Sequence, residues 1–467
     1  MEILSLKEII SAVKGVLLEN LVDIEDIKIK SVTIDSRAIE EMALFVPLHG
    51  EKINSHNFIN QAFENGAIAT LTDESVELNP NYIYIKVDNT LKALQDLAAF
   101  YRRKFNIPVI GITGSVGKTS TKEMISCVLE SNYKVLKTQG NLNGQIGLPL
   151  TIFNLNNEHE AAILEMGISE PNEMDKLSYI ASPNYAVISN VGVTHIENFN
   201  TRNNILKEKI KIINTLGKNS SLLLNTDNDL LKSYTESCSA HFKIMGFGIN
   251  DHTDFFAENI NVDGKNTEFD VIFDGRKEKI ELPVIGEHNI YNALSAIALG
   301  LEFNISMNDI KSALRNYKTL KMRQCIDDVD FDEKRITIID DTYNANPDSM
   351  KSAIKVLSML GKGRRKIAIL SDMLELGEYS DKLHVEVGEF VSKKEIDILL
   401  TIGEKSKYIA KGAQSFPGKS IQSMHFMSNS DCFEYLKNLL NINDIVLLKG
   451  SRGMHLEEIV NEIMKKV

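Results

Sequence analysis

The stretch VIGITGSVGKTS, residues 109–120, decides the fold of the middle of this chain. It begins with a short apolar run typical of a buried strand, continues into a glycine-rich turn, and leads into a helix from about Ser120. Glycines let backbone N–H groups approach a phosphate closely, Lys118 supplies a positive charge, and the Thr119 hydroxyl suits Mg²⁺. The stretch therefore predicts a loop that binds the phosphates of a nucleotide through Gly114, Ser115, Val116, Gly117, Lys118, Thr119 and Ser120.

The match to the general phosphate-loop pattern is incomplete. The pattern requires Gly at position 112, where this chain has Ile112, and Gly111 comes one residue too early. An ordinary glycine-rich turn between a strand and a helix is the alternative, but Lys118 and Thr119 in this context favour phosphate binding. A phosphate loop alone fits a nucleotide switch, a kinase or a ligase. No guanine-reading N-K-x-D motif follows, which argues against a GTP switch.

Apolar strand candidates alternate with helical segments around this loop. The predicted strands are Val109–Thr113, Lys134–Lys137, Ala161–Glu165, Tyr185–Ser189 and Ser221–Asn225. This alternation favours a mostly parallel sheet with helices on both faces. A buried helix at His288–Leu301, rich in small residues, follows the sheet.

The regions on either side have patterns of their own. The first holds short mixed segments at Ile27–Ile34, Ala43–Pro47 and Ile68–Leu71. Tyr82–Val87 is rich in aromatic and β-branched residues, which predicts a strand, and a helix is predicted at Thr90–Lys104. The last has predicted strands at Arg335–Ile339, Lys366–Leu370, Ile396–Ile402 and Asp444–Lys449. We therefore expect an α/β protein of three domains: a small α/β domain at 1–100, a central P-loop-type parallel sheet at 101–318, and a Rossmann-like α/β domain at 319–467.

Composition narrows the class of protein. The formal net charge of −12 argues against a nucleic-acid partner or a membrane-surface protein. The four cysteines lie far apart without a C-x-x-C pair, which favours free thiols in a reducing compartment. The first residues lack a signal-peptide core, and no apolar run reaches the roughly 18 residues that span a bilayer. We expect a cytoplasmic monomer with no membrane insertion.

Groups suited to metal binding follow two further strands. Glu165 ends a predicted strand, and the carboxyl ends of parallel strands face the ligand crevice, so its carboxylate is placed to bind Mg²⁺. His195 comes shortly after the next strand and is a candidate for a second metal or the reacting phosphate. The alternatives are a surface Glu and a hydrogen-bonded structural His. Lys207 and Lys209 lie in a charged helix that composition alone assigns to a solvated face.

Taken together, these motifs resemble the Mur ligase family, the ATP-dependent amino-acid ligases of bacterial peptidoglycan synthesis. The segments that carry the resemblance are Thr113–Thr119, Glu165–Gly167, Asn190–His195, Gly286–Ala293, Arg323, Asp340–Met350, Asp372–Gly377, Lys449–Met454, Asp35–Arg37 with Leu44–Val46, and Gly140–Asn143 with Ile146–Pro149. They extend over almost the whole chain. The chain departs from the family pattern at Glu41–Ala43, Asn54, Gly144 and Lys211.

The resemblance implies an ATP- and Mg²⁺-dependent carbon–nitrogen ligase that works through an acyl phosphate. The Asp340–Met350 motif is most similar to the branch of the family that adds D-Ala-D-Ala to UDP-MurNAc-tripeptide and forms UDP-MurNAc-pentapeptide. Another member, such as a tripeptide-forming ligase or a folylpolyglutamate synthase, is the alternative. A non-catalytic P-loop interaction protein is a further alternative, but it predicts no use for Glu165, His195 and Asn289.

The resemblance also implies a role for each matching residue. Lys209 comes 14 residues after His195, as does the family lysine that CO₂ converts to a carbamate, and Lys207 is the alternative in register. The implied catalytic groups are Lys118, Glu165, His195 and carbamylated Lys209. The implied ligands of two Mg²⁺ ions are Thr119, Glu165, His195 and Lys209. The implied ATP contacts beyond the loop are Asn289, Asn292, Arg323 and Asp341. The implied substrate contacts are Ser36, Arg37, Asn141, Asn143, Tyr343, Asn344 and Asn346.

Overall fold

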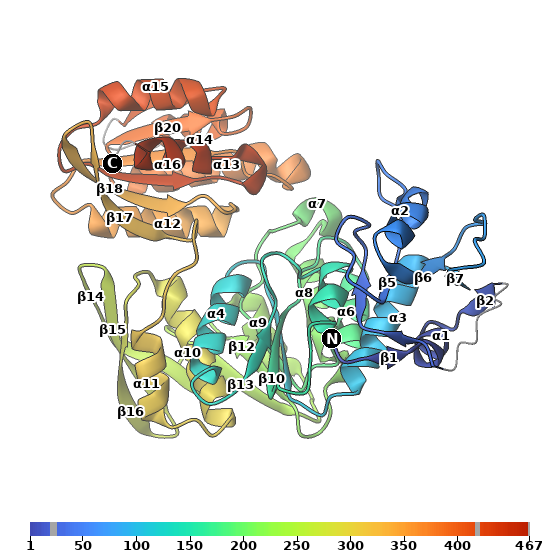
Figure 1. The fold of residues 1–467 in the computed structure, drawn as a ribbon. Helices are drawn as coiled ribbons and strands as arrows, with labels where there is room; N and C mark the ends of the chain where they lie inside the picture. Colours follow the sequence, from blue (N-terminus) through green and yellow to red (C-terminus); the bar gives the residue numbers. More distant parts are fainter. Residues whose placement is uncertain (19–25, 416–420, 466–467) are drawn as a thin grey trace.

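A computed structural model describes residues 1–18, 26–415 and 421–465 of the chain. Three separate main sheets follow one another along the sequence (Figure 1). The C-terminal part lies above the central part in this view, and the N-terminal part lies to the right. The fold is α/β throughout, as the alternation of strands and helices predicts. No helix among the described residues is long and apolar enough to cross a membrane.

The N-terminal part is built on a five-stranded sheet of order β2-β7-β6-β5-β4. Its strands are β2 (Val16–Leu18), β7 (Ile83–Lys86), β6 (Ala67–Thr72), β5 (Ala43–Phe45) and β4 (Ser31–Thr33). Two short strands, β1 (Leu4–Ser5) and β3 (Lys28–Ile29), pair beside it. Its helices are α1 (Leu6–Val13), η1 (Ser55–Phe58) and α2 (Ile59–Glu64), and α3 (Thr90–Arg103) leads into the central part. The predicted strand at Tyr82–Val87 is confirmed as β7 and the predicted helix as α3, while β3, β4, β5 and β6 fall on the short mixed segments.

The central sheet has nine strands in the order β16-β15-β14-β13-β12-β11-β8-β10-β9. Its parallel part consists of β9 (Val135–Lys137), β10 (Ala161–Glu165), β8 (Val109–Thr113), β11 (Tyr185–Ile188), β12 (Ser221–Asn225), β13 (Lys243–Gly248) and β14 (Phe255–Asp263). An antiparallel extension, β15 (Asn266–Phe273) and β16 (Arg276–Leu282), completes it. The five predicted strands are confirmed as β8, β9, β10, β11 and β12, whereas the sequence patterns indicated neither β13 and β14 nor the antiparallel extension.

Helices cover both faces of this sheet. One face packs against α4 (Lys118–Leu129), α10 (Glu287–Glu302) and α11 (Met307–Arg315). The other packs against α3, α5 (Gly147–Ile152), α6 (Glu173–Ala181), α8 (Arg202–Ile210) and α9 (Asp229–Ser237). Successive residues of β8 alternate between the two cores, as side chains of a strand must. The short helices α7 (Ile196–Phe199) and η2 (Lys211–Thr215) lie in the connections.

The C-terminal sheet has six strands in the order β17-β18-β22-β19-β20-β21. They are β17 (Cys325–Phe331), β18 (Lys334–Asp341), β22 (Ile445–Lys449), β19 (Lys366–Ser371), β20 (Ile398–Ile402) and β21 (Gln422–Phe426), and only β17 is antiparallel. One face packs against α12 (Pro347–Leu360), α13 (Ser380–Lys393) and α14 (Lys407–Ser415), and the other against α15 (Asn429–Leu439) and α16 (Glu457–Met464). Two short turns, η3 (Gly377–Tyr379) and η4 (Arg452–Met454), follow strands β19 and β22.

Helices α13 and α14 approach closely because glycines face each other. A Cβ atom added at Gly388 would lie 2.0 Å from the backbone oxygen of Ile409, and one at Gly412 would lie 2.2 Å from that of Val385. We expect Gly388→Ala to lower the free energy of unfolding by about 1–3 kcal/mol, because the helices must separate. Urea denaturation measures this change. Gly217→Ala, where an added Cβ meets nothing within 4 Å, is the control, and an equal loss in both variants would contradict the packing argument.

Candidate functional site

The phosphate loop joins the end of β8 to the start of α4. Its two glycines have positive φ angles, +153° at Gly114 and +87° at Gly117, and a Cβ at Gly114 would lie 2.0 Å from the Ser189 Oγ. A larger residue is therefore excluded at Gly114 by both conformation and space. Gly117 precedes the first turn of α4, whose N–H groups and dipole favour a bound anion.

The segment after β11 holds the phosphate loop in place. The backbone N–H of Ser115 donates to the Asn190 oxygen (3.1 Å), and that of Val116 donates to the Asn190 side chain (2.7 Å). The Ser115 hydroxyl in turn accepts from the Gly192 N–H (2.9 Å). In this conformation the amides of Ser115 and Val116 are thus occupied.

Oxygen ligands suited to Mg²⁺ lie beside the loop. The Thr119 hydroxyl donates to Glu165 Oε2 (2.9 Å), and the Asn143 amide donates to Glu165 Oε1 (2.8 Å). Glu165 ends β10, next to β8, and is only 2% exposed. A buried carboxylate beside a hydroxyl is a hard-oxygen donor set of the kind Mg²⁺ prefers.

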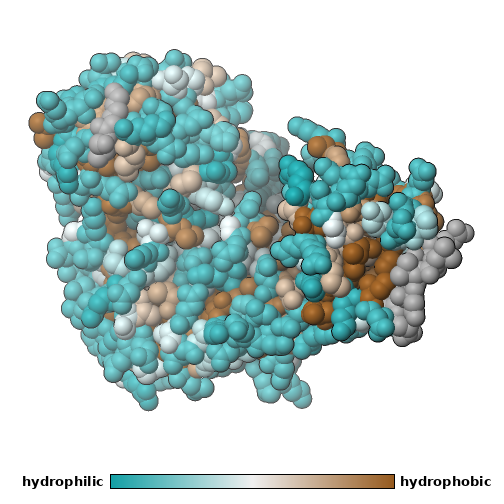
Figure 2. All heavy atoms as spheres, in the orientation of Figure 1, coloured by the Kyte–Doolittle hydropathy of each residue, from teal (hydrophilic) through white to brown (hydrophobic). Residues whose placement is uncertain are grey.

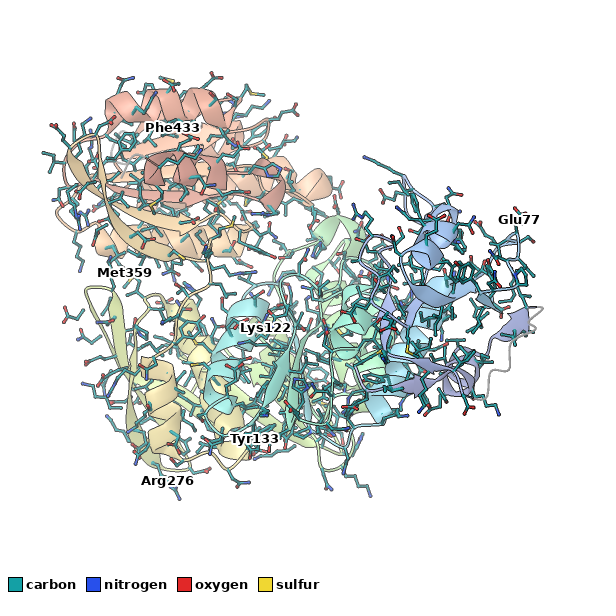
Figure 3. The ribbon with its side chains drawn as sticks, in the orientation of Figure 1. Glu77, Lys122, Tyr133, Arg276, Met359 and Phe433 are labelled. Carbon is teal, nitrogen blue, oxygen red and sulfur yellow. The ribbon has the colours of Figure 1, made fainter. Side chains whose placement is uncertain are left out.

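Three buried or partly buried lysines surround the loop and differ in their partners. Lys122 on α4 (Figure 3) forms an ion pair with Glu123 (2.9 Å) and donates to the Thr138 oxygen (2.5 Å), so its charge is used within the fold. Lys118 donates to the Gly114 oxygen (2.8 Å). Burial lowers the pKa of Lys118, while the nearby Glu165 carboxylate acts in the opposite direction. Among the described residues, Lys118 thus has a backbone hydrogen bond and no ion pair.

The third lysine, Lys209, is on α8 and is 2% exposed. Burial, and next the neighbouring Lys118, hold the pKa of Lys209 well below its ordinary value. No carboxylate among the described residues lies within ion-pair distance of its ammonium group. Lys207 on the same helix is exposed, so the two candidates for the carbamate occupy different environments.

His195 connects the central part to the C-terminal part. It follows β11, immediately before α7, and its Nδ1 lies 2.8 Å from Glu375 Oε2. The hydrogen bond to His195 lowers the pKa of the Glu375 carboxyl against the effect of burial. Sequence reasoning did not identify Glu375, because one acidic residue in a loop has no diagnostic spacing. Its place within the family-like segment Asp372–Gly377 was the available signal.

Further C-terminal groups approach the loop. Arg323 donates to the Thr119 hydroxyl (2.9 Å), and its guanidinium lies 4.0 Å from the centre of the Tyr343 ring. Lys449 forms an ion pair with Asp341 (2.6 Å) and donates to the Asn344 oxygen (3.0 Å), which fixes the segment between them. No role for Lys449 was drawn from its motif in the sequence.

Three asparagine side chains complete this side of the site. Asn346 is the N-cap of α12 and donates to the Thr194 hydroxyl (3.1 Å). Asn292 accepts from the Thr121 hydroxyl (2.8 Å), and Asn289 donates to the Ile285 oxygen (2.9 Å). Both residues of this second pair are buried near the start of α10. Both line the cavity described below.

One cavity of about 480 Å³ collects most of these groups. The predicted site residues that line it are Ser115, Val116, Gly117, Lys118, Thr119, Ser120, Asn141, Asn143, Glu165, His195, Asn289, Asn292, Arg323, Asp341, Tyr343, Asn344 and Asn346. Glu375, Lys449 and His288 line it as well. In the space-filling view the surface is hollowed between the C-terminal and N-terminal parts (Figure 2). The central and C-terminal parts thus share one polar cavity.

Four predicted site residues do not line this cavity. Gly114 and Lys209 lie behind it, within the packing of the phosphate loop and α8. Ser36 and Arg37 lie in the N-terminal part after β4, where Ser36 donates to the Gln61 side chain (2.8 Å) and the exposed Arg37 pairs with Asp35 (2.8 Å). Any role for Ser36 and Arg37 therefore concerns a portion of substrate outside the cavity.

Comparisons with known proteins agree with this arrangement. Three family models match successive parts of the chain: "Mur ligase family, catalytic domain" at residues 28–102, "Mur ligase middle domain" at 112–300, and "Mur ligase, glutamate ligase domain" at 326–452. A relative from Bacillus subtilis (strain 168), UDP-N-acetylmuramoyl-tripeptide–D-alanyl-D-alanine ligase, is 38% identical over 99% of this chain and 98% of its own length.

Solved structures are similar over the same extent. MurF from Acinetobacter baumannii superposes with a TM-score of 0.91 at 29% identity and covers 100% of both chains. MurF ligase from Thermotoga maritima, solved in complex with ADP, has a TM-score of 0.82 at 26% identity over 93% of this chain and 97% of that one. With these matches over its full length, and with this cavity between its central and C-terminal sheets, the chain belongs to the Mur ligase family.

Proposed function

We propose that this chain is an ATP-dependent ligase that adds D-alanyl-D-alanine to UDP-N-acetylmuramoyl-tripeptide and forms UDP-MurNAc-pentapeptide, ADP and phosphate. The relative from Bacillus subtilis carries the name of this activity. The observation that carries the proposal is the cavity in which Lys118, Glu165 and Arg323 meet. A phosphate loop, a metal-type carboxylate and a group from the last sheet in one cavity suit transfer of a phosphoryl group with closure over it.

The reaction requires an activated carboxylate. The γ-phosphoryl group of ATP is transferred to the terminal carboxylate of the tripeptide, which gives an acyl phosphate and ADP. The amino group of the dipeptide then attacks the acyl carbon, phosphate leaves, and the nitrogen loses a proton. Lys118 and the first turn of α4 hold the phosphates, and Arg323 with Asp341 completes the ATP site. The enzyme mainly positions groups and excludes the water that would hydrolyse the acyl phosphate.

The donor set fits Mg²⁺. Thr119 and Glu165 would hold one ion, and His195 with a carbamate on Lys209 would hold a second. Bound Mg²⁺ neutralises the charge that builds up on the phosphates. The carbamate is supported by the burial of Lys209 beside Lys118, because Lys118 disfavours the cationic form of this amine and would attract the anion that CO₂ makes of it.

Each part of the chain receives a role in this proposal. Residues 1–100 bind the UDP-sugar end of the tripeptide substrate, with contacts from Ser36 and Arg37. Residues 101–318 bind ATP, and Asn289 and Asn292 contact its base while Asn141 and Asn143 contact the acceptor. Residues 319–467 receive the dipeptide through Tyr343, Asn344 and Asn346 and close the ATP site. The proposed setting is a monomer in the cytoplasm, with no nucleic acid and no membrane as partner.

A direct assay tests the proposal. Purified protein is given ATP, Mg²⁺, UDP-MurNAc-tripeptide and D-Ala-D-Ala, and phosphate and UDP-MurNAc-pentapeptide are measured together. We expect both products in equal amounts and neither when the dipeptide is omitted. Phosphate release only with a different amine acceptor would identify another Mur-type activity. Nucleotide binding without turnover would identify a non-catalytic nucleotide-binding protein.

The hydrogen bond from Arg323 to Thr119 can be tested by replacing Arg323. It donates to Thr119 across the cavity and stacks on Tyr343, so Arg323→Ala removes a charge-assisted contact worth about 1.5–3 kcal/mol. We expect kcat/KM for ATP to fall by roughly 10- to 100-fold, since each tenfold corresponds to about 1.4 kcal/mol. Steady-state kinetics with varied ATP measures this. Arg335→Ala, at an exposed arginine that pairs with Asp330, is the control. Equal kinetics in both variants would contradict the contact.

A further inference from the structure

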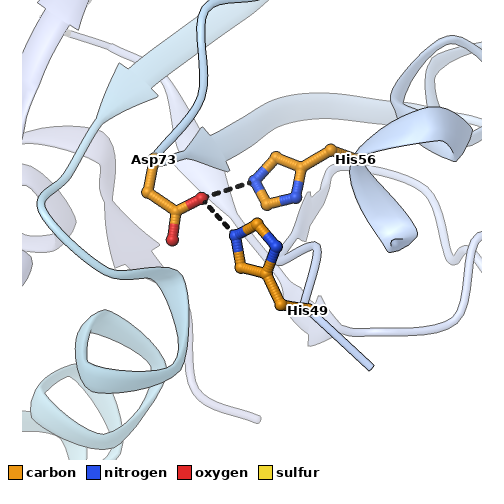
Figure 4. Close-up of side chains that lie close together, drawn as sticks. All are labelled: His49, His56 and Asp73. Atoms are coloured by element: carbon orange, nitrogen blue, oxygen red, sulfur yellow. Dashed lines mark hydrogen bonds and ion pairs between the residues drawn. The ribbon is translucent and has the colours of Figure 1, made fainter. Parts of the chain in front are cut away.

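Two histidines and an aspartate lie together in the N-terminal part, outside the nucleotide cavity (Figure 4). His49 follows β5, His56 is in η1, and Asp73 follows β6. The His49 Nε2 lies 2.8 Å from Asp73 Oδ1, and the His56 Nε2 lies 3.0 Å from the same oxygen. The potential ligand atoms all lie within 4.8 Å of one another. Three segments of chain thus direct three donor atoms at one point.

The hydrogen bonds of Asn54 determine which nitrogen of His56 carries hydrogen. The Asn54 Oδ1 accepts the backbone N–H of His56 (3.1 Å), and its Nδ2 donates to Glu74 (2.7 Å), so the orientation of the amide is fixed. The same Oδ1 lies 2.8 Å from the His56 Nδ1, which must therefore donate. A neutral His56 ring consequently has its lone pair on Nε2.

This lone pair faces another acceptor. His56 is 6% exposed, and its Nε2 makes no hydrogen bond although Asp73 Oδ1 is 3.0 Å away. Two facing acceptors in a buried place repel unless a proton or a metal cation lies between them. The gap between these two atoms is therefore a place for one cation.

The distances suit a small transition-metal ion. Ligand atoms around a tetrahedral zinc ion lie about 3.3 Å apart, given metal–ligand bonds of roughly 2.0–2.1 Å. The contacts to Asp73 Oδ1 are within about half an ångström of that separation. Asp73 Oδ2 accepts the Thr90 backbone N–H (3.0 Å), which orients the carboxylate and leaves Oδ1 for the metal. Asn54 plays the same orienting part for His56, as outer partners of metal-bound histidines do.

We propose that His49, His56 and Asp73 bind one divalent zinc-class ion through Nε2, Nε2 and Oδ1, with the fourth position open to water. Two imidazoles and a carboxylate suit Zn²⁺ better than Mg²⁺ or Ca²⁺, which prefer oxygen donors alone. The ion ties the loop after β5 and helix η1 to the end of β6, near the start of α3. It acts as a structural clamp and takes no part in the proposed ligase reaction.

Zinc binding to the full chain tests the proposal. Tag-free protein is stripped with EDTA, kept in excess Mg²⁺ so that the nucleotide cavity does not bind zinc, and titrated with Zn²⁺ by calorimetry. We expect one ion per chain and a higher Tm with zinc. Co²⁺ in its place should give the visible absorption of a histidine-ligated, four-coordinate ion. Failure of the wild-type chain to bind zinc under these conditions would overturn the site.

Zinc binding by variants inside and outside the cluster tests where the ion binds. His49→Gln is expected to weaken zinc binding by at least about 10-fold and to retain the fold, because 48% of the His49 side chain is exposed. Asn54→Ala is expected to weaken it by about 10- to 100-fold through the lost support of His56. His252→Ala, at an exposed histidine outside the cluster, is the matched control. Zinc binding that is equal in all three variants would place the ion elsewhere. Because no substrate is used, the result is independent of ligase activity.

Discussion

Replacing Lys118 with methionine should lower kcat/KM for ATP by about 10³-fold, which corresponds to about 4 kcal/mol of transition-state stabilisation. Lys118 lies at the first turn of α4 and near the Glu165 carboxylate, and its one hydrogen-bond partner among the described residues is the Gly114 backbone oxygen. Methionine has a similar length without the charge. Phosphate release under saturating acceptor, measured across ATP concentrations, gives the loss. Lys118→Arg should recover little of it, since a planar guanidinium does not fit where a point charge does.

The stability of this variant separates a catalytic loss from a folding loss. Folding lowers the pKa of Lys118, so the native state disfavours the charged form, and the cation opposes folding at pH values below its unfolded pKa. Removing it should leave the Tm unchanged or raise it slightly. Lys382→Ala, at an exposed lysine that does not line the cavity, should affect neither activity nor Tm. Activity of Lys118→Met within about twofold of wild type would contradict the role of the phosphate loop.

Strands that form a continuous apolar run could be predicted from the sequence, and strands without such a run could not. Strands β10 and β12 are fully buried apolar runs, and their predicted bounds agree with the structure. Strand β16 begins with four charged residues and buries only Ile280 and Leu282, so its sequence has no apolar run. The Asp-Gly pairs that end at Gly264 and Gly275 could have predicted this extension. They form the tight turns that connect β14 to β15 and β15 to β16.

A site residue could be predicted where its place at the end of a strand of the parallel sheet alone determines its position. Glu165 ends a strand beside β8, and a parallel sheet brings such residues together whatever else the chain does. The pairing of His195 with Glu375 depends instead on how the C-terminal part packs against the central one. The cluster of His49 and Asp73 likewise depends on the course of a loop. Local patterns contain no information about these two arrangements.

The second large effect on activity is expected when Lys209 is replaced. Lys209→Ala should lose ligase activity by at least about 10²-fold, and high bicarbonate should not restore it. The buried amine lies beside Lys118, and its lowered pKa leaves the neutral form that reacts with CO₂. Wild-type protein depleted of CO₂ should therefore regain activity on addition of bicarbonate. Lys209→Met keeps the volume of the side chain, so it should show the same loss of activity without a buried cavity.

The exposed Lys207 on the same helix makes the test specific. Lys207→Ala should keep nearly full activity, because its side chain is in solvent and contacts neither the phosphate loop nor the cavity. With ¹³C-bicarbonate, NMR should detect a carbamate carbon in wild type and in Lys207→Ala but not in Lys209→Ala. The reverse pattern would assign the carbamate to Lys207. Full activity of Lys209→Ala would end the carbamate hypothesis altogether, and the second metal would then need another ligand from the cavity, such as Glu375, whose Oε2 lies 2.8 Å from the His195 Nδ1.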